Sequence, residues 1–447
     1  MLKRQLLAIE FVLFSAAIFA QDFNTQQLSN YLDTLNAHQR ASGALALRAD
    51  GKLLFSKSIG VRNTDESGNV APDDKTAFRI GSISKTFTAV MIMQLVQKGD
   101  VSLDDPLSNW YPSVPNAANI TIKQMLNHSS GIYSITSDPE YLEYMETAQT
   151  HEQMLQRIYE FEPAFAPGTK HSYSNSNFVL LGYILEKETG ISYAQLVEKK
   201  ITKPLKFKRT YYGGPIDPQG QNEAQSYEWD GRRWIPSTET DMSIPHGAGS
   251  MVSTAEDLTT FITALFSGKL IGDDQLSQMT TVEDGYGLGI FPIDVHGKEG
   301  FGHNGGIDDF AAVLVYVPED DLAIAFTANV VRYDIDEMRA VAASAFYGDI
   351  LEMPTFVQVD LSPEYLHSLE GTYKSETFPL PIEVRTNGAQ LTAQAEGQPE
   401  LPLEPQGDDV FTLERAGIVM TFSKDESGEF CCFHLEQGQF VADFKKE

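Results

Sequence analysis

Residues 78–88 read Phe78-Arg79-Ile80-Gly81-Ser82-Ile83-Ser84-Lys85-Thr86-Phe87-Thr88, which places a serine three residues before a lysine. Apolar residues continue from here with helical spacing to Gly99, a C-terminal stop, so a helix is predicted from Ile83 with Ser82 at its N-terminus. Helical i, i+3 spacing puts Lys85 on the face that carries Ser82. A serine hydroxyl attacks only when a neighbour takes its proton, so the pair predicts a nucleophile with a proton acceptor beside it. Chance alone would supply about one or two S-x-x-K matches in a chain of this length, so the prediction depends on residues elsewhere.

Composition limits what the protein can bind. The chain has 447 residues, enough for two domains, one of them with a sizeable core. Its 33 Lys and Arg residues against 62 Asp and Glu residues give a formal net charge of −29. Such a charge repels nucleic acid and anionic membrane surfaces. We therefore exclude nucleic-acid binding and expect a small-molecule or peptide substrate as the partner; the oligomeric state is left open.

The N-terminus is similar to a secretory signal peptide. Two basic residues near the start precede an apolar stretch from Leu6 to Ala20, which Glu10 interrupts. The apolar stretch is too short to span a membrane comfortably. We predict that residues 1–20 are a signal peptide cleaved after Ala20, that the protein is exported to the periplasm or secreted, and that no stable membrane span remains. An uncleaved anchor is the alternative.

The pattern of apolar residues predicts an α+β domain at residues 21–352. Alternating strands are expected from Gly43 to Ser58, and a hairpin from residues 311–317 and 322–329. Helical patterns fill the middle of the domain, and one more helix is expected at 335–345. Strands from both ends of the domain would therefore enclose helices.

A small all-β domain is expected at the C-terminus. After a linker at residues 353–360, residues 361–447 consist of short alternating stretches separated by turn residues. A sheet of this size must close or cover its edges, which favours a small barrel or meander. Cys431 and Cys432, the two cysteines of the chain, are adjacent in one predicted strand. Alternation should point them to opposite faces and prevent a disulfide.

Short metal and cofactor motifs are missing from the sequence. There is no C-x-x-C, calcium-loop or P-loop pattern, and His151-Glu152 is followed by Leu155 where an H-E-x-x-H motif needs a second histidine. We therefore expect neither a metal ion nor a cofactor.

Two further short motifs follow Ser82 in order along the chain. Tyr173-Ser174-Asn175 comes shortly after Pro167-Gly168-Thr169, and His303-Asn304-Gly305-Gly306 precedes a predicted strand. Each motif alone is weak, because a triplet of this kind is expected about once per chain by chance. Their occurrence in this order with Ser82-x-x-Lys85 is what gives them weight.

With these motifs and the stretch Ala248–Leu258, residues 24–348 resemble the serine beta-lactamase and penicillin-binding-protein superfamily. The similarity is to its branch of class C beta-lactamases, DD-carboxypeptidases, D-aminopeptidases and esterases. It implies a beta-lactamase-like fold, an antiparallel sheet flanked by helices with a mainly helical subdomain. The C-terminal domain is similar to the lipocalin-like β modules appended to many such hydrolases.

The resemblance also implies roles for individual residues. Ser82 would form an acyl-enzyme, while Lys85 and Tyr173 would share one proton, and either of them could accept it from the serine. The oxyanion would be held by the backbone N–H groups of Ser82 and Gly306. The remaining implied site residues are His303 in catalysis and Asn175, Asn304 and Gly305 in substrate binding, with Asn175 also a partner of Lys85.

The third motif departs from the family pattern. Many beta-lactamases and penicillin-binding proteins have Lys-Thr-Gly or Lys-Ser-Gly where this chain has His303-Asn304-Gly305. Lysine is a permanent cation that attracts a substrate carboxylate, whereas histidine is mostly neutral at pH 7. Asp308-Asp309 beside the motif could bind a substrate amine, although a solvated surface position is the favoured interpretation.

The sequence therefore predicts an exported serine hydrolase. Its substrates would be D-amino-acid peptides or amides, as for a DD-peptidase or D-aminopeptidase, or small esters. One alternative is a beta-lactamase. Another is a sensor that is acylated by penicillin-like ligands, or that recognises peptidoglycan, without turnover.

Overall fold

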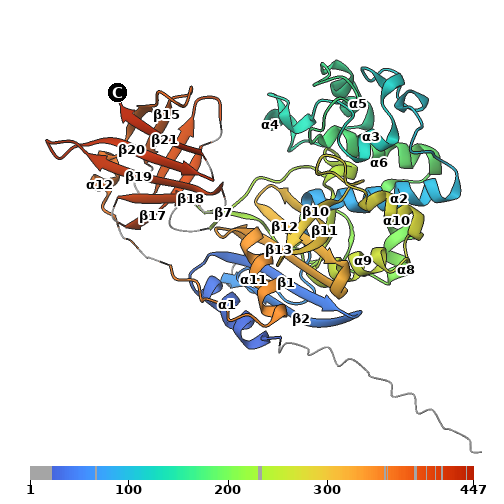
Figure 1. Cartoon of the computed structure of the whole chain (residues 1–447), viewed down its shortest axis with the longest axis horizontal. Helices are drawn as coiled ribbons and strands as arrows, with labels where there is room; N and C mark the ends of the chain where they lie inside the picture. The colour runs from blue at the N-terminus through green and yellow to red at the C-terminus, as the bar shows by residue number, and fades with distance from the viewer. Residues whose placement is uncertain are drawn as a thin grey trace, which may run out of the picture.

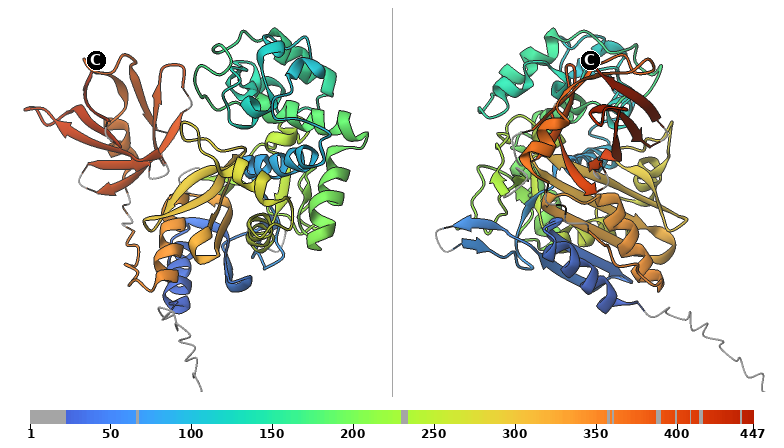
Figure 2. Two further views of the ribbon diagram at one scale, coloured as in Figure 1. Left: turned by 45° about the vertical axis from the view of Figure 1, so that its right-hand side comes forward. Right: turned by 90° about the vertical axis from the view of Figure 1, so that its left-hand side faces the viewer.

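The computed structural model describes residues 23–65, 68–229, 234–356, 359, 361–386, 390–398, 400–407, 409–413, 416–438 and 440–447. The predicted signal peptide lies outside these residues. Figures 1 and 2 show a larger body that holds a central sheet and most of the helices, with a smaller β body beside it.

The central sheet of the larger body is antiparallel and joins strands from both ends of the α+β region. The strand order is β10-β11-β12-β13-β1-β2. The predicted strands at 43–58 form β1 and β2, and the predicted hairpin forms β12 and β13, in which Ala311 pairs with Ala328. The strand bounds are β1 (Ala41–Ala49), β2 (Lys52–Ile59), β10 (Phe291–Val295), β11 (Lys298–Ile307), β12 (Phe310–Val317) and β13 (Leu322–Val331).

Both faces of this sheet are buried, and the side chains alternate between two cores. On β1, Leu45 and Leu47 pack toward helices α1 (Thr25–Ala37) and α11 (Ile335–Tyr347). Ala44 and Ala46 face the larger core on the other side of the sheet. Small side chains on that side leave room for the helix α9 (Ala255–Phe266), which contacts β1, β12 and β13.

A mainly helical region separates β2 from β10 in the sequence. Its helix starts are well defined, since Thr121, Thr150 and Ser192 each form a capping box with the glutamine three residues later. The remaining helices are α2 (Ser84–Lys98), α3 (Ile122–Leu126), α4 (Tyr141–Tyr144), α5 (His151–Glu160), α6 (Asn175–Thr189), α7 (Tyr193–Val197), α8 (Lys203–Leu205) and α10 (Asp273–Thr280). A π-helical turn, η5 (Glu198–Thr202), lies between α7 and α8.

Short strands and 3-10 turns connect these helices. The strands form one three-stranded sheet, β5-β9-β6, and two hairpins, β3-β4 and β7-β8. Their bounds are β3 (Asn63–Asp65), β4 (Gly68–Val70), β5 (Phe78–Arg79), β6 (Tyr211–Tyr212), β7 (Tyr227–Trp229), β8 (Trp234–Pro236) and β9 (Met251–Ser253). The 3-10 turns are η1 (Gly81–Ile83), η2 (Leu107–Asn109), η3 (Ala117–Asn119), η4 (Ile135–Ser137), η6 (His246–Ala248) and η7 (Pro318–Asp320).

The C-terminal β body is a closed barrel, as the edge argument favoured. Its last strand pairs with its first through Tyr373 and Lys446, and a separate apolar core fills it. The short helix α12 (Pro363–Ser368) precedes the strands. In order they are β14 (Gly371–Lys374), β15 (Ile382–Thr386), β16 (Leu391–Ala395), β17 (Leu401–Gly407), β18 (Val410–Leu413), β19 (Ile418–Lys424), β20 (Phe430–Gln437) and β21 (Phe440–Lys446). The predicted α+β class with a C-terminal all-β barrel is therefore confirmed.

The predicted alternation of the two cysteines is wrong, although both thiols are free. Ser423 pairs with Cys432 and Lys424 pairs with Phe430, so Cys431 is the extra residue of a β-bulge. A side-chain hydrogen bond joins the two thiols and raises the pKa of Cys432. The bulge cancels the alternation on which the prediction depended.

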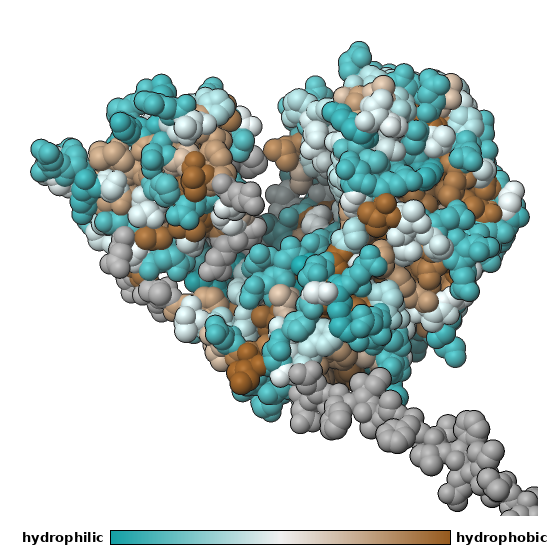
Figure 3. Space-filling model, viewed as in Figure 1, coloured by the Kyte–Doolittle hydropathy of each residue, from teal (hydrophilic) through white to brown (hydrophobic). Residues whose placement is uncertain are grey.

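The barrel meets the larger body through one carboxylate. Glu404 on β17 pairs with Arg40 at the start of β1, and it accepts a hydrogen bond from Nε of Arg332, just after β13, at 2.6 Å. A cavity of about 220 Å³ lies between the two bodies, lined by residues of both, and Figure 3 shows the hollow that separates them. Across the described residues, we find no helix of the length and apolarity that a membrane crossing requires.

Candidate active site

Ser82 lies in the 3-10 turn η1, and Lys85 lies in the first turn of α2. Figure 1 shows α2 between the central sheet and the helical region. The predicted helix is therefore present, with its α-helical part starting two residues after the serine and ending before Gly99, whose φ is 77°. The Lys85 Nζ atom lies 2.9 Å from the Ser82 Oγ atom. The spacing in the sequence thus brings the two groups into hydrogen-bond contact.

Lys85 is fully buried among neutral partners. Apart from its contact with Ser82, the Nζ atom donates to the Asn175 side-chain oxygen at 2.7 Å and to the Ala248 carbonyl at 2.8 Å. In the described part of the chain it has no carboxylate partner, and burial lowers its pKa well below the ordinary value. A buried amine without a counter-charge is stabilised in its neutral form.

Two residues at the 3-10 turn η4, Ser134 and Thr136, fix the orientation of Asn175 at the start of α6. Its amide nitrogen donates to the Thr136 hydroxyl at 2.9 Å, so its oxygen is left to accept from Lys85. Its backbone N–H donates to the Ser134 hydroxyl at 3.1 Å. The predicted contact between Asn175 and Lys85 is therefore present, and the amide cannot turn without losing both bonds.

Tyr173 lies beside Ser82, as its motif predicted. Its side chain is hydrogen-bonded to that of Ser82, and the Lys85 ammonium position is 4.8 Å from the centre of its ring. Burial raises the pKa of the phenol, and the hydrogen bond with Ser82 opposes only part of this effect. The neutral phenol is thus the stable form in the free protein.

His128 belongs to this cluster but was missed in the sequence. Its ring stacks on Tyr173 with 4.4 Å between centroids, and its Nδ1 atom accepts from the Ser174 N–H at 3.1 Å. Burial, then the nearby Lys85, lowers its pKa well below the ordinary value. No local spacing connects residue 128 to Ser82, so only the fold could identify it.

His303 is buried on β11 and faces the same cluster. Its ring centre lies 6.2 Å from that of Tyr173, and its Nδ1 atom donates to the Asn304 carbonyl oxygen. Burial and the proximity of Lys85 lower its pKa to about 3. Among the described residues its Nε2 atom has no hydrogen-bond partner. The ring therefore presents a neutral imidazole to this cluster.

Two glycines bring β11 against the turn that carries the nucleophile. A Cβ atom on Gly305 would lie 2.0 Å from the Ile80 carbonyl oxygen, and one on Gly81 would lie 2.7 Å from the Gly306 nitrogen. Side chains at these positions would force the turn and the strand apart. Gly306 itself is exposed, and its missing side chain leaves open space.

Asn304 lies on the other side of the strand. Its amide nitrogen donates to Asp336 on α11 at 3.3 Å, while its neighbour His303 faces Tyr173. Alternation along β11 explains this division. Substrate binding by the Asn304 side chain stays a prediction.

The expectation of a solvated Asp308 is wrong. Its side chain is 0% exposed, and it pairs at 2.8 Å with Arg79, the residue three positions before Ser82. Asp308 also accepts from the Thr240 backbone N–H at 3.0 Å and from its hydroxyl at 2.7 Å. The ion pair ties the strand before the nucleophile to the turn after Gly306. A partner more than two hundred residues away could not be identified from the local sequence.

Comparisons with known proteins identify the family of the chain. The family model named Beta-lactamase matches residues 28–345. The chain is 27% identical over 230 residues to the teichoic acid D-alanine hydrolase of Staphylococcus aureus, an alignment that covers 51% of this chain and 55% of that protein. The chain spans between 55% and 65% of the length of the first curated relatives that it matches.

Two solved structures are also similar. The D-stereospecific amidohydrolase from a Streptomyces species superposes with a TM-score of 0.60 at 31% identity, covering 68% of this chain and 94% of that one. The octameric penicillin-binding protein homologue from Pyrococcus abyssi shares the fold, with a TM-score of 0.64 at 24% identity over 94% of this chain and 99% of that one. The predicted beta-lactamase-like fold is confirmed, and the chain belongs to the Beta-lactamase family.

Proposed function

We propose that the protein is a serine hydrolase that cleaves amides or esters of D-amino acids through an acyl-enzyme at Ser82. The observation that carries the proposal is the environment of Lys85, a fully buried amine in contact with Ser82 and without a counter-charge. A structural lysine would be exposed or paired with a carboxylate.

The hydrogen bonds of Lys85 determine how it would act. A neutral amine has two N–H donors and one lone pair. The Asn175 side-chain oxygen and the Ala248 carbonyl can only accept, so they take the two donors. The lone pair is then left for Ser82, whose hydroxyl can donate. We therefore assign the uptake of the serine proton to Lys85, which the sequence left open between Lys85 and Tyr173.

Tyr173 would serve the second half of the proton transfer. As Ser82 Oγ bonds to the substrate carbonyl carbon, its proton moves to the Lys85 amine. The neutral Tyr173 phenol, which is hydrogen-bonded to Ser82, can donate its proton to the leaving amine or alcohol and regain one from Lys85. Water then cleaves the serine ester by the reverse route. The backbone N–H groups of Ser82 and Gly306 would hold the oxyanion.

The neutral His303 supports substrates without a carboxylate next to the cleaved bond. A DD-carboxypeptidase substrate and a β-lactam both carry a carboxylate on the leaving side, and an imidazole with a pKa of about 3 offers it no positive charge. An amide or an ester of a D-amino acid has no carboxylate there and needs no positive charge at position 303. The names of the relatives, a D-stereospecific amidohydrolase and a teichoic acid D-alanine hydrolase, support the same class.

Intact-mass spectrometry with matched substrates tests the proposal. The protein is incubated with the p-nitrophenyl ester and the amide of D-alanine, with their L-enantiomers, and with a D-alanyl-D-alanine peptide. We expect turnover of the D-ester and D-amide, preference over the L-forms, and a trapped acyl adduct that Ser82→Ala abolishes. Equal turnover by Ser82→Ala would overturn the assignment of the nucleophile. Faster turnover of the D-alanyl-D-alanine peptide than of the D-ester and D-amide would overturn the proposed substrate class.

The beta-lactamase and sensor alternatives are separated by two more reagents. A chromogenic cephalosporin should be hydrolysed much more slowly than the D-ester, because His303 supplies no cation. A fluorescent penicillin that acylates Ser82 while neither the ester nor the amide is turned over would favour the sensor.

We also propose export and a division into two domains. The basic N-terminus and apolar stretch of residues 1–20 support a signal peptide, and a mature protein that begins at Gln21 in the periplasm or medium would establish it. The separate apolar core of the barrel supports a hydrolase domain at 21–352, a linker at 353–360 and a barrel domain at 361–447. Limited proteolysis within the linker should release a folded barrel.

A further inference from the structure

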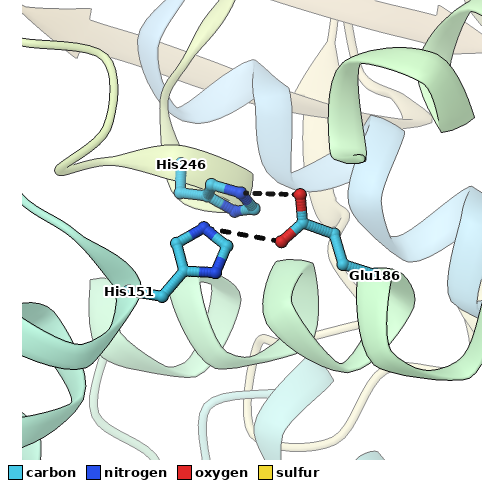
Figure 4. Close-up of side chains that lie close together, drawn as sticks. All are labelled: His151, Glu186 and His246. Atoms are coloured by element: carbon cyan, nitrogen blue, oxygen red, sulfur yellow. Dashed lines mark ion pairs between the residues drawn. The ribbon is translucent and has the colours of Figure 1, made fainter. Parts of the chain in front are cut away.

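A second cluster of ionisable side chains lies outside the nucleophile site. It consists of His151 at the start of α5, Glu186 on α6 and His246 at the start of η6. Figure 4 shows both imidazole rings directed at the same carboxylate, one at each oxygen. The potential ligand atoms all lie within 4.8 Å of one another. The three residues come from segments far apart in the sequence, so the search for local motifs could not reveal the cluster.

The distances in this cluster suit a bound ion better than hydrogen bonds. The His151 Nε2 atom lies 3.5 Å from one Glu186 oxygen, and the His246 Nε2 atom lies 3.7 Å from the other. Hydrogen bonds between such groups are normally about 2.7–3.2 Å long. Neighbouring ligand atoms of a tetrahedral zinc ion with bonds of about 2.0–2.1 Å are about 3.4 Å apart. Each imidazole nitrogen is therefore spaced from the Glu186 oxygen that it faces like two neighbouring ligands of one ion.

The surroundings hold the ligands in place. The His246 side chain is 4% exposed and is packed beside the rings of Tyr183 and Tyr193, with centroids 4.7 and 5.0 Å away. Its backbone φ is 37°, in the left-handed region that residues other than glycine rarely adopt. One Glu186 oxygen also accepts the Tyr193 backbone N–H at 2.8 Å, the kind of supporting bond that orients a metal ligand.

The cluster is also open to solvent on one side. The His151 side chain is 50% exposed, whereas that of Glu186 is 19% exposed. An ion could enter past His151 and keep a water molecule in its fourth position.

We propose that His151, Glu186 and His246 form a binding site for a divalent transition-metal ion, with two imidazoles and one carboxylate as ligands and zinc as the best fit. The ion would stabilise the turn η6. Two residues after His246, the Ala248 carbonyl accepts from Lys85, and the Gly247 carbonyl accepts from Thr88 on α2 at 2.7 Å. The site is thus placed to hold the backbone that positions Lys85, and it has no part in the reaction itself. Metal binding does not depend on the proposed hydrolase activity.

Zinc binding to the full chain tests this proposal. The protein is treated with a chelator, exchanged into metal-free buffer and titrated with Zn²⁺, followed by native mass spectrometry and calorimetry. We expect one tight equivalent, a higher melting temperature with Zn²⁺, and a visible absorption band of tetrahedral Co²⁺ when Co²⁺ replaces zinc. Absence of a tight equivalent would overturn the proposal.

Two variants identify the ligands, and a third is the control. His151→Ala changes a half-exposed side chain at a helix start, and Glu186→Gln keeps the shape of the carboxylate. Each should weaken Zn²⁺ binding about 100-fold or more, judged against the 10- to 100-fold losses that supporting residues cause. His434→Ala removes an exposed barrel histidine beside Asp443 and Glu436, and it should leave binding unchanged. Unchanged affinity in His151→Ala and Glu186→Gln would overturn the assignment, as would loss in His434→Ala alone.

Discussion

Two buried basic side chains flank Ser82 at equal distance in the sequence, and they differ in their partners. Arg79, three residues before Ser82, is paired with the buried Asp308 and with Glu239. Lys85, three residues after Ser82, meets only neutral groups. A guanidinium keeps its proton in proteins, and a carboxylate beside it makes a structural ion pair. Burial of a lysine that has no carboxylate partner lowers its pKa and favours the neutral amine. The partner thus decides whether a buried basic side chain near Ser82 keeps its charge or is stable in the neutral form.

The largest effect is expected when Lys85, the proposed proton acceptor, is removed. Lys85→Met keeps most of the side-chain volume and should slow acylation of Ser82 about 10²- to 10⁴-fold, the typical range for a general base. The melting temperature should not fall, because burial of an amine without a counter-charge disfavours the folded state at neutral pH. Stopped-flow release of p-nitrophenol measures the rate. Lys98→Met, at the exposed end of the same helix, is the control, and a near-wild-type rate in Lys85→Met would remove Lys85 from the mechanism.

Breaking the ion pair on the other side should act on stability instead. Asp308→Ala leaves Arg79 buried without its main partner and should lower the free energy of unfolding by about 3–5 kcal/mol. Urea denaturation measures the loss. Asp309→Ala, which removes the adjacent carboxylate outside this pair, should have a much smaller effect. Equal losses in the two variants would show that the pair with Arg79 is not what stabilises the turn.

A third variant gives Lys85 a carboxylate partner, as Arg79 has in Asp308. Asn175→Asp replaces the amide by a carboxylate of the same shape next to the amine. A carboxylate favours the charged lysine, so the pKa of Lys85 should rise and acylation at neutral pH should fall about tenfold for each unit of that rise. The rate should recover as the pH is raised. A pH-independent loss would instead mean that Asn175 acts on substrate alone.

The smallest expected effect is the pH dependence of stability. Burial lowers the pKa of Lys85 in the folded protein, so between that pKa and about 10.5 the unfolded chain binds the extra proton, and stability rises with pH. His303 contributes with the same sign, but its gain is complete above about pH 6.5. Above pH 7 the wild type should therefore gain up to about 1.4 kcal/mol per pH unit more than Lys85→Met in urea denaturation. Identical slopes would show that Lys85 is charged in the folded state.

Local patterns in the sequence predicted what depends on neighbouring residues. Helical spacing placed Lys85 against Ser82, alternating residues gave the strands of the central sheet, and short strands with turns gave the barrel. The motif order suggested that Tyr173 and His303 would join the nucleophile, and the structure brings their rings near one another.

What the sequence could not provide depends on pairs of distant residues. Asp308 was expected at the surface because its partner, Arg79, is on another strand. His128 was missed because its stacking on Tyr173 comes from the path of a loop. The bulge at Cys431 reversed the expected alternation because strand register is set by the opposite strand as well.

Gly305 limits how the sequence around Ser82 can change during evolution. The atom that a side chain there would strike is the Ile80 carbonyl oxygen, a backbone atom that no mutation removes. No exchange at a neighbouring position can restore the missing space, so substitution at residue 305 has no local suppressor. Position 303 and the loops near Ser82 carry side chains that can be exchanged. New specificities should therefore arise around a spacing between the Ser82 turn and β11 that stays fixed.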